Sequence, residues 1–146
     1  RALETLLGAV APGGLAYFPV TFDGETVFRP VSDEDRERRV IDAYHGHMDG
    51  PTRPGGSQTG RALFAAVPAA GGEVLAAGGS DWVVTPPYPA DEAYFLHHLI
   101  HTVEEAVRET GAEVPVEAWA RDRHAAVSAA SLTYLTHQVD LLARVG

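Results

Sequence analysis

Cysteine is absent from this sequence, basic residues are few, and no stretch is continuously apolar over the length of a membrane span. Without cysteine, the chain has no disulfide and no thiolate zinc site, which suits a reducing cytoplasm. A formal net charge of −9, from 11 basic and 20 acidic residues, argues against nucleic acids and anionic membranes as partners. A span needs roughly 20 apolar residues, and no basic region followed by an apolar one indicates a signal peptide. We therefore expect a cytoplasmic protein that handles a small molecule.

The residues that are present suffice for one compact domain with a hydrophobic core. The chain has 146 residues, of which 45% are hydrophobic, and this fraction is too high for a disordered chain. It begins at Arg1 without a methionine, and apolar residues follow at helical spacing (Leu3, Leu6, Leu7 and Val10). Because a natural start inside an uncapped helix is unusual, we expect a fragment or a processed product.

The N-terminal part of the chain predicts a helix, a strand and a second helix. The opening helix ends at Pro12-Gly13-Gly14, and the apolar run Leu15–Phe22 predicts a buried strand. Asp23-Gly24 is typical of a two-residue turn, so we expect Glu25–Phe28 to return as the second strand of a hairpin. Acidic residues at a helix N-terminus predict the next helix, from Ser32 to about Met48.

The rest of the chain predicts two more strands and three helices. The expected elements are a loop over Gly50–Gly60, a short helix over Arg61–Val67, strands over Glu73–Ala77 and Trp82–Val84, a connection over Thr85–Pro89, and long helices from Asp91 to Glu109 and from Val116 to Ala143. The apolar runs around Tyr17 and Leu75 predict interior strands of a parallel sheet that helices cover on both faces.

Three short motifs resemble known sites, but a structural role explains each of them more simply. His45-Gly46-His47-Met48-Asp49 has the H-x-H-x-D spacing of metallo-β-lactamase-like hydrolases, but Gly50 stands where that family has a further histidine. His97-His98-Leu99-Ile100-His101 lacks the glutamate that acts as general base in H-E-x-x-H proteases. Thr85-Pro86-Pro87-Tyr88 is similar to the D/N/S-P-P-Y loop of amino-methyltransferases, with threonine at an unusual position. We therefore predict no metal site.

Several segments, taken in their order along the chain, resemble the C-terminal part of class I S-adenosylmethionine-dependent methyltransferases of the actinobacterial type. The segments that carry this resemblance are Ala11–Phe18, Thr21–Thr26, Ile41–Asp49, Gly60-Arg61, Ser80–Val84, Tyr88–Leu96 and His137–Asp140. The resemblance implies an α/β fold. Residues 1–89 would form the distal half of a Rossmann-like methyltransferase sheet, and residues 90–146 would form a C-terminal helical element.

The resemblance also implies what the chain lacks and what it contributes. In the family, the glycine-rich cofactor loop follows the first strand, so the main S-adenosylmethionine-binding half lies outside this chain. What remains is the acceptor-side pocket for a small molecule, and its expected substrate-binding residues are Phe22, Asp23, Tyr44, His45, Met48, Ser80, Asp81 and Trp82. The catalytic residues stay open, although His45 or Asp23 could accept a proton. The expected partner is the missing N-terminal half or a second copy of the chain.

Two functions from other classes remain as alternatives. One is a non-catalytic α/β interaction module, which an apolar surface patch would favour. The other is a metal-dependent hydrolase that uses His45, His47 and Asp49, which bound zinc would favour.

Overall fold

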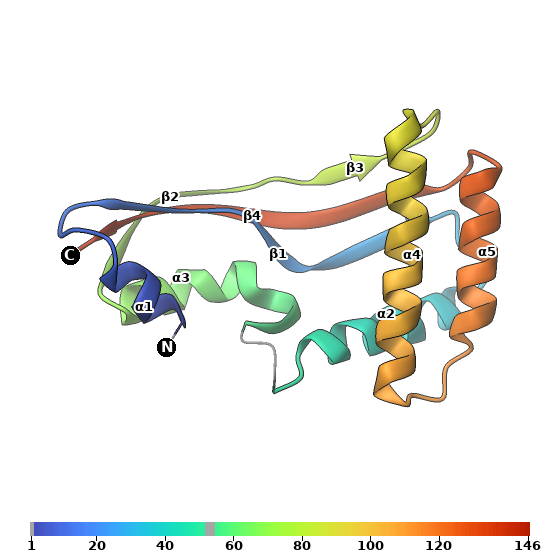
Figure 1. Cartoon of the computed structure of the whole chain (residues 1–146), viewed down its shortest axis with the longest axis horizontal. Helices are drawn as coiled ribbons and strands as arrows, with labels where there is room; N and C mark the ends of the chain where they lie inside the picture. Colours follow the sequence, from blue (N-terminus) through green and yellow to red (C-terminus); the bar gives the residue numbers. More distant parts are fainter. Residues whose placement is uncertain (1, 52–54) are drawn as a thin grey trace. The chain divides into compact units, whose positions relative to one another are not determined.

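The computed structural model describes residues 2–51 and 55–146 and shows a mixed α/β fold with an open sheet (Figure 1). The elements are α1 (Ala2–Gly8), β1 (Leu15–Arg29), α2 (Glu34–Met48), the short 3-10 helix η1 (Gly56–Gln58), α3 (Thr59–Ala69), β2 (Gly72–Gly79), β3 (Trp82–Val84), α4 (Ala90–Thr110), α5 (Val116–Ser128) and β4 (Thr133–Val145). Arg1 and part of the predicted loop, residues 52–54, lie outside the described residues.

The sheet has the strand order β1-β4-β2, and β3 pairs with β4. β2 and β4 run antiparallel, with Gly72 opposite Val145 and Gly79 opposite Val139. The expectation of a parallel sheet is therefore wrong for this pair of strands. The expectation of interior strands is also wrong, because Tyr17 is 59% exposed and Leu75 is 37% exposed. An antiparallel sheet can leave one face to solvent, whereas a parallel sheet is covered on both faces.

The chain divides into two compact units, and the division crosses β1, β3 and β4. Unit 1 comprises Arg1–Glu25, Pro51–Trp82 and Thr136–Gly146, and unit 2 comprises Thr26–Gly50 and Val83–Leu135. Each unit has its own hydrophobic core, so each can be understood from its own packing.

In unit 1, α1 and α3 cover one face of the strands (Figure 1). Leu63 and Val67 of α3 pack against Leu141 and Ala143 of β4. Half-buried side chains from α1, β1 and β2 complete this cluster (Leu3, Phe18 and Val74). The core is small, and it uses only one face of each strand.

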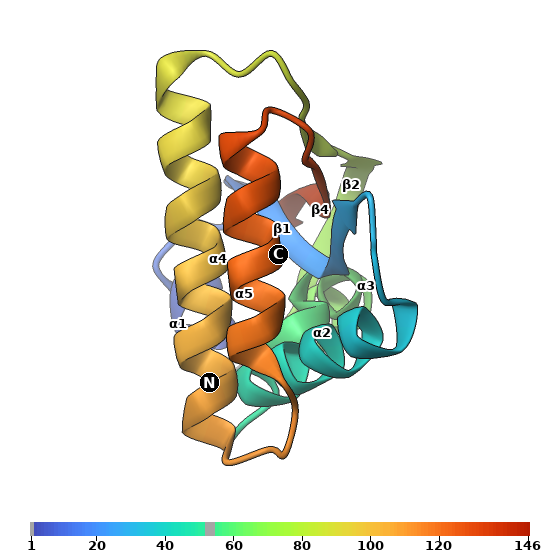
Figure 2. The same ribbon diagram turned by 90° about the vertical axis from the view of Figure 1, so that its right-hand side faces the viewer.

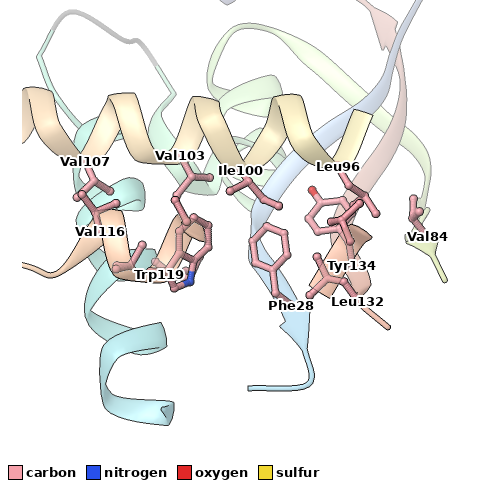
Figure 3. Packing of buried hydrophobic residues seen from close by; sticks show 14 residues of the cluster. Phe28, Val84, Leu96, Ile100, Val103, Val107, Val116, Trp119, Leu132 and Tyr134 are labelled. Carbon is pink, nitrogen blue, oxygen red and sulfur yellow. The ribbon is translucent and has the colours of Figure 1, made fainter. Parts of the chain in front are cut away.

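In unit 2, α4 and α5 lie side by side and α2 crosses them (Figure 2). α4 presents Leu96, Ile100, Val103 and Val107 to the core at helical spacing, and all four are fully buried. Figure 3 shows Phe28 of β1 beneath this row. The Phe28 ring meets Trp119 edge-on at a centroid distance of 5.5 Å, a geometry that aromatic pairs favour.

A buried ion pair joins the helices of unit 2. Glu37 of α2 accepts hydrogen bonds from Arg123 and from the indole nitrogen of Trp119 on α5, the latter at 2.6 Å. Arg123 also donates to the carbonyl oxygen of Pro30 at 2.5 Å. Because a buried charge is costly without a partner, these bonds fix α2 against α5.

The expected helix starts and stops are largely confirmed. α2 begins directly after Asp33, whose carboxylate accepts a hydrogen bond from the backbone nitrogen of Arg36 at 3.0 Å. α4 ends at Gly111, which has the left-handed φ of 68° that a helix C-terminus favours in glycine. The short helix and the two strands expected between residues 61 and 84 are also present as α3, β2 and β3.

The expected hairpin at Asp23-Gly24 is wrong, because β1 runs through both residues without turning. Gly24 has a φ of 84°, which accounts for a glycine within the strand. The Asp23 side chain accepts hydrogen bonds from Arg61 of α3 instead of closing a turn. A tertiary contact has therefore replaced the local use of an Asp-Gly pair.

The expected final helix to Ala143 is also wrong, because α5 ends at Ser128 and residues Thr133–Val145 form β4. Burial alternates from Leu132, just before β4, through Tyr134 and Thr136, and it alternates again through Val139, Leu141 and Ala143. Alternation is the period of a strand. The alternation shifts by one residue between Thr136 and Val139. As a result, Leu132, Leu135, Val139 and Leu142 are spaced by three and four residues, as apolar residues are in a helix.

Candidate functional site

The predicted substrate-binding residues divide between the two units. Five of them belong to unit 1 (Phe22, Asp23, Ser80, Asp81 and Trp82), and three belong to α2 in unit 2 (Tyr44, His45 and Met48). Within unit 1, Asp23 of β1 and Asp81 of the β2–β3 connection are linked through His137 of β4. We call these three residues the Asp23–His137–Asp81 cluster.

His137 lies between the two carboxylates of the cluster. Its Nδ1 is 2.6 Å from Oδ1 of Asp81, which is a short hydrogen bond. Its Nε2 is 3.9 Å from Oδ2 of Asp23, which is too long for a direct hydrogen bond. The Asp23 side chain is 8% exposed and that of His137 is 35% exposed, so the cluster has a buried side and a side open to solvent.

Arg61, in the first turn of α3, fixes the Asp23 carboxylate. Oδ1 of Asp23 accepts hydrogen bonds from the Arg61 backbone nitrogen at 2.6 Å and from its Nε at 3.0 Å. The Arg61 guanidinium also donates to the backbone oxygen of Asp23 at 2.7 Å. The first backbone N–H groups of a helix have no partner within the helix, so Asp23 supplies one for α3.

The close contact between α3 and β1 depends on Gly60. A Cβ atom at Gly60 would lie 2.9 Å from the backbone oxygen of Thr21 and 3.0 Å from Cβ of Asp23. Any side chain at this position would therefore push α3 away from β1. The glycine brings the start of α3 within hydrogen-bonding distance of Asp23.

Arg61 also sets the charge of Asp23. Burial acts to raise the pKa of the Asp23 carboxyl, but hydrogen bonds and the positive charge from Arg61, with a smaller contribution from His137, bring this pKa below its ordinary value. Asp23 therefore stays a carboxylate at neutral pH. It presents Oδ2 toward His137 while Oδ1 is held by Arg61.

A pocket of about 390 Å³ opens beside the cluster. Its lining comprises Asp23, Arg61, Phe64, Ala77, Gly78, Gly79, His137 and Val139. A Cβ atom at Gly78 would meet no atom within 4 Å, and one at Gly79 would lie 3.1 Å from Cε1 of His137. Gly79 therefore leaves room for the imidazole ring.

The cluster is arranged for proton transfer. A neutral His137 that donates its Nδ1–H to Asp81 presents the lone pair of Nε2 toward Asp23. The carboxylate at Nδ1 fixes the orientation of the ring. His137 therefore has the surroundings of a general base.

The remaining predicted residues of unit 1 border this cluster in sequence. Ser80 lies next to Asp81, and its hydroxyl oxygen is buried without a hydrogen-bond partner among residues 2–51 and 55–146. Trp82 is 43% exposed, and Phe22 is half-buried next to Asp23. None of these three side chains lines the pocket.

In unit 2, the residues of the H-x-H-x-D motif have separate contacts. Nε2 of His45 is 3.2 Å from the hydroxyl oxygen of Thr26, and Nε2 of His47 is 3.6 Å from Oε2 of Glu109. Tyr44 packs against the core of unit 2, and Met48, the last residue of α2, is half-buried. Across the described part of the chain, no group of three or more His, Cys, Asp or Glu residues could hold a metal ion.

The other two motifs also have structural contacts within unit 2. His97 forms a hydrogen bond with His124 of α5, with 2.7 Å between their Nδ1 atoms. The Tyr88 hydroxyl donates to the backbone oxygen of Leu132 at 2.5 Å and accepts from its backbone nitrogen at 3.0 Å, so this residue ties two loops together. Burial raises the pKa of Tyr88 above its ordinary value, against the hydrogen bond with Leu132.

Sequence reasoning missed His137 and Arg61. His137 was assigned to a helical tail, where it would not have reached Asp23 or Asp81. The alternation of Leu132, Tyr134 and Thr136, followed by that of Val139, Leu141 and Ala143, is the sequence pattern that indicates a strand there. Arg61 offered no such signal, because its role depends on the contact between α3 and β1.

The comparisons with known proteins give no relative from which a role could be transferred. No family model matches the sequence, and no curated protein matches it. Among the helices of the described residues, none combines the length and the apolar character that crossing a membrane requires. The function must therefore be argued from the geometry of the Asp23–His137–Asp81 cluster and from the strand order.

Proposed function

We propose that this chain supplies the acceptor side of an S-adenosylmethionine-dependent methyltransferase and holds a small molecule against the Asp23–His137–Asp81 cluster. The observation that carries the proposal is the strand order β1-β4-β2, in which the last strand of the chain lies between two earlier strands and runs antiparallel to β2. By the resemblance of the sequence, β1 and β2 would be the fifth and sixth strands of a Rossmann-like methyltransferase sheet, and β4 would be a further strand between them.

The residues present do not fit the cofactor itself. In the described ranges, no glycine-rich turn leads from the end of a strand directly into a helix: residues 30–33 between β1 and α2, and residues 85–89 between β3 and α4, contain no glycine. Such a turn is what brings a backbone close to a nucleotide. The cofactor would therefore be held by residues outside this chain, and we assign it no contact here.

What the chain contributes is orientation of the acceptor and removal of its proton. Methyl transfer depends on alignment of the reacting atoms and on exclusion of water. In the pocket, Phe64, Ala77 and Val139 supply apolar contacts, while Asp23 and His137 supply polar ones. An acceptor bound there would meet Nε2 of His137, which takes its proton, while Asp81 holds the ring.

Two titrations of the chain test this proposal. Calorimetry with S-adenosylmethionine should show no tight complex, because the strand-to-helix turns at residues 30–33 and 85–89 contain no glycine. Saturation-transfer NMR with three small probes that share a phenyl ring and differ in head group (phenethylamine, 2-phenylethanol and 3-phenylpropionate) should detect binding of at least one. A tight one-to-one cofactor isotherm, or the absence of binding by every probe, would contradict the proposal.

The variant Ala77→Leu provides the matched control. Ala77 lines the pocket and, like Gly79, lies on the face of β2 that is turned toward His137, so a leucine at this position occupies pocket volume. It should abolish probe binding while the amide spectrum of the chain stays folded. Binding that survives this substitution would place the probe outside the pocket.

A second candidate function, a non-catalytic interaction module, is favoured by exposed apolar side chains in unit 1. Leu15 and Tyr17 point to the same side of β1, because they are two residues apart, and they are 58% and 59% exposed. Sedimentation distinguishes this candidate. Self-association that Tyr17→Ser abolishes would support it, and a monomer at tens of micromolar would argue against it.

A further inference from the structure

We infer that the ligand of the Asp23–His137–Asp81 cluster carries a primary amine, whose nitrogen donates to Nε2 of His137 and to Oδ2 of Asp23 together. This inference rests on the proposed function, because it names the chemical class of the molecule that the pocket accepts. It starts from the two acceptor atoms that face each other across 3.9 Å.

The distance between these two acceptors selects a donor atom that carries at least two hydrogens. For a nitrogen about 2.8 Å from both atoms, the angle between the two acceptors would be about 90°; this is about 20° less than the tetrahedral angle between two N–H bonds, so each bond bends by only about 10°. A hydroxyl has one hydrogen, so it satisfies one acceptor and leaves the other without a partner. A carboxylate has none and would be repelled by Asp23.

The charge of the site also favours a cation. Two carboxylates, Asp23 and Asp81, face one guanidinium, Arg61, so the site carries a net charge of −1 when His137 is neutral. Both the side-chain nitrogen Nε and the backbone nitrogen of Arg61 are already bonded to Asp23. A bound ammonium group would therefore balance the remaining negative charge.

The apolar lining and the volume of the pocket limit the substituent that the amine can carry. Phe64, Ala77 and Val139 offer apolar contacts, and Gly78 adds no side chain. The volume of about 390 Å³ is enough for a group the size of an aromatic ring. The favoured ligand is therefore a primary amine with a short apolar or aromatic substituent.

The cluster can also convert the bound ammonium into a nucleophile. The N–H bond directed at His137 breaks, its electron pair stays on the amine nitrogen, and the proton forms a new bond to Nε2. The resulting imidazolium lies between the carboxylates of Asp81 and Asp23, which stabilise it. The products are a neutral amine and a protonated His137, so charge and atoms balance.

The test ranks three matched probes by NMR titration of the whole chain. Phenethylamine, 2-phenylethanol and 3-phenylpropionate are added separately, and the signals of the His137 ring are followed. The amine should bind at least about tenfold more tightly than the alcohol, since it makes one more charge-assisted hydrogen bond. The propionate should leave the His137 signals unchanged.

Variants then identify the two acceptors. Asp23→Asn and His137→Phe should each weaken amine binding about tenfold or more, because each removes one acceptor. Glu73→Gln, which removes an exposed carboxylate of β2 that pairs with Arg144, should leave the affinity unchanged. If Asp23→Asn disturbs α3, the His137→Phe variant still decides, because the imidazole of His137 interacts with Asp81 and Asp23, whereas the start of α3 is held by the bonds between Arg61 and Asp23.

The outcomes separate this inference from the proposed function. If the alcohol binds in the pocket as tightly as the amine, or if Asp23→Asn and His137→Phe leave amine binding unchanged, the amine inference is wrong and the acceptor pocket stands. If no probe binds, both are wrong. Amine binding that Ala77→Leu abolishes and Glu73→Gln preserves supports both.

Discussion

The two units of the chain use their charged residues in opposite ways. In unit 2, Glu37 and Arg123 are buried and bonded to each other, with Trp119 beside them. In unit 1, Asp23 is equally buried, but one of its oxygens is turned toward a half-exposed histidine and a pocket. A buried charge whose partners are all internal fixes the arrangement of the elements around it, whereas a buried charge that faces a pocket is available for chemistry.

The hydrophobic cores of the two units also differ, in size and in how far they are shielded from solvent. The unit 2 core is built from three helices and three aromatic rings, and Phe28 lies between Trp119 and Tyr134 (Figure 3). The unit 1 core is a small cluster on one face of the strands, with Tyr17 and Leu75 exposed on the sheet. We therefore expect unit 2 to dominate the stability of the chain and unit 1 to carry its function.

The largest effect should follow from removing the central indole of unit 2. Trp119→Ala creates a cavity beside Phe28 and takes a donor from Glu37, so the free energy of unfolding should fall by about 3–5 kcal/mol. Urea denaturation followed by circular dichroism measures this loss. Tyr94→Ala, at a site that is 76% exposed, is the control and should change stability by less than about 0.5 kcal/mol. Equal losses in the two variants would contradict the packing described for unit 2.

The buried ion pair should give the next largest effect. Arg123→Met leaves the Glu37 carboxylate buried without its charged partner and should cost about 3 kcal/mol. The double variant Glu37→Leu with Arg123→Met removes both charges and should recover much of this loss, as urea denaturation would show. A double variant no more stable than Arg123→Met would mean that the pair itself, and not the uncompensated charge, sets the cost.

The effect of pH on the free energy of unfolding, through His124 of unit 2, should be smaller than the effect of breaking the ion pair. Burial, and then the neighbouring charges of His97 and His101, lower the pKa of His124 below its ordinary 6.5, although Glu104 acts in the opposite direction. The folded state then binds fewer protons than the unfolded state, so the free energy of unfolding should fall as the pH drops below about 6.5. Urea denaturation at pH 7.5 and 5.5 tests this, and His124→Gln should flatten the difference. An unchanged slope in the variant would locate the pH dependence elsewhere.

The smallest effect on stability should come from the cluster of unit 1. Asp81 is half exposed, so Asp81→Asn should change the free energy of unfolding by less than about 0.5 kcal/mol. The same variant should alter the tautomer of His137, because an amide no longer accepts from Nδ1 as strongly as a carboxylate. Nitrogen NMR of the imidazole measures this change. A stable variant with an unaltered tautomer would mean that Asp81 does not orient His137.

The sequence was informative wherever a local signal decided the structure. Asp33 at a helix N-terminus and Gly111 at a helix C-terminus were sufficient to predict α2 and α4, because caps act within one turn. Local signals failed where distant contacts decided. Asp23-Gly24 has the composition of a turn, but the bonds from Arg61 hold Asp23 within β1.

The candidate site was predictable in part. Asp23 and Asp81 were identified because each lies at a predicted strand or turn, but the residue that joins them was not. The spacing of Leu132, Leu135, Val139 and Leu142 imitates a helix, so His137 was placed on the wrong type of element. Sequence also could not tell that Tyr44, His45 and Met48 belong to a different compact unit from Asp23.

Chemical-shift mapping of the whole chain with phenethylamine tests the central claim most directly, because it reports on both units at once. The account predicts that the shifts concentrate on Asp23, Arg61, Gly78, Gly79 and His137 in unit 1, while the signals of His97 and His124 in unit 2 stay in place. Shifts centred on unit 2, or none at all, would contradict the assignment of the functional site to the Asp23–His137–Asp81 cluster.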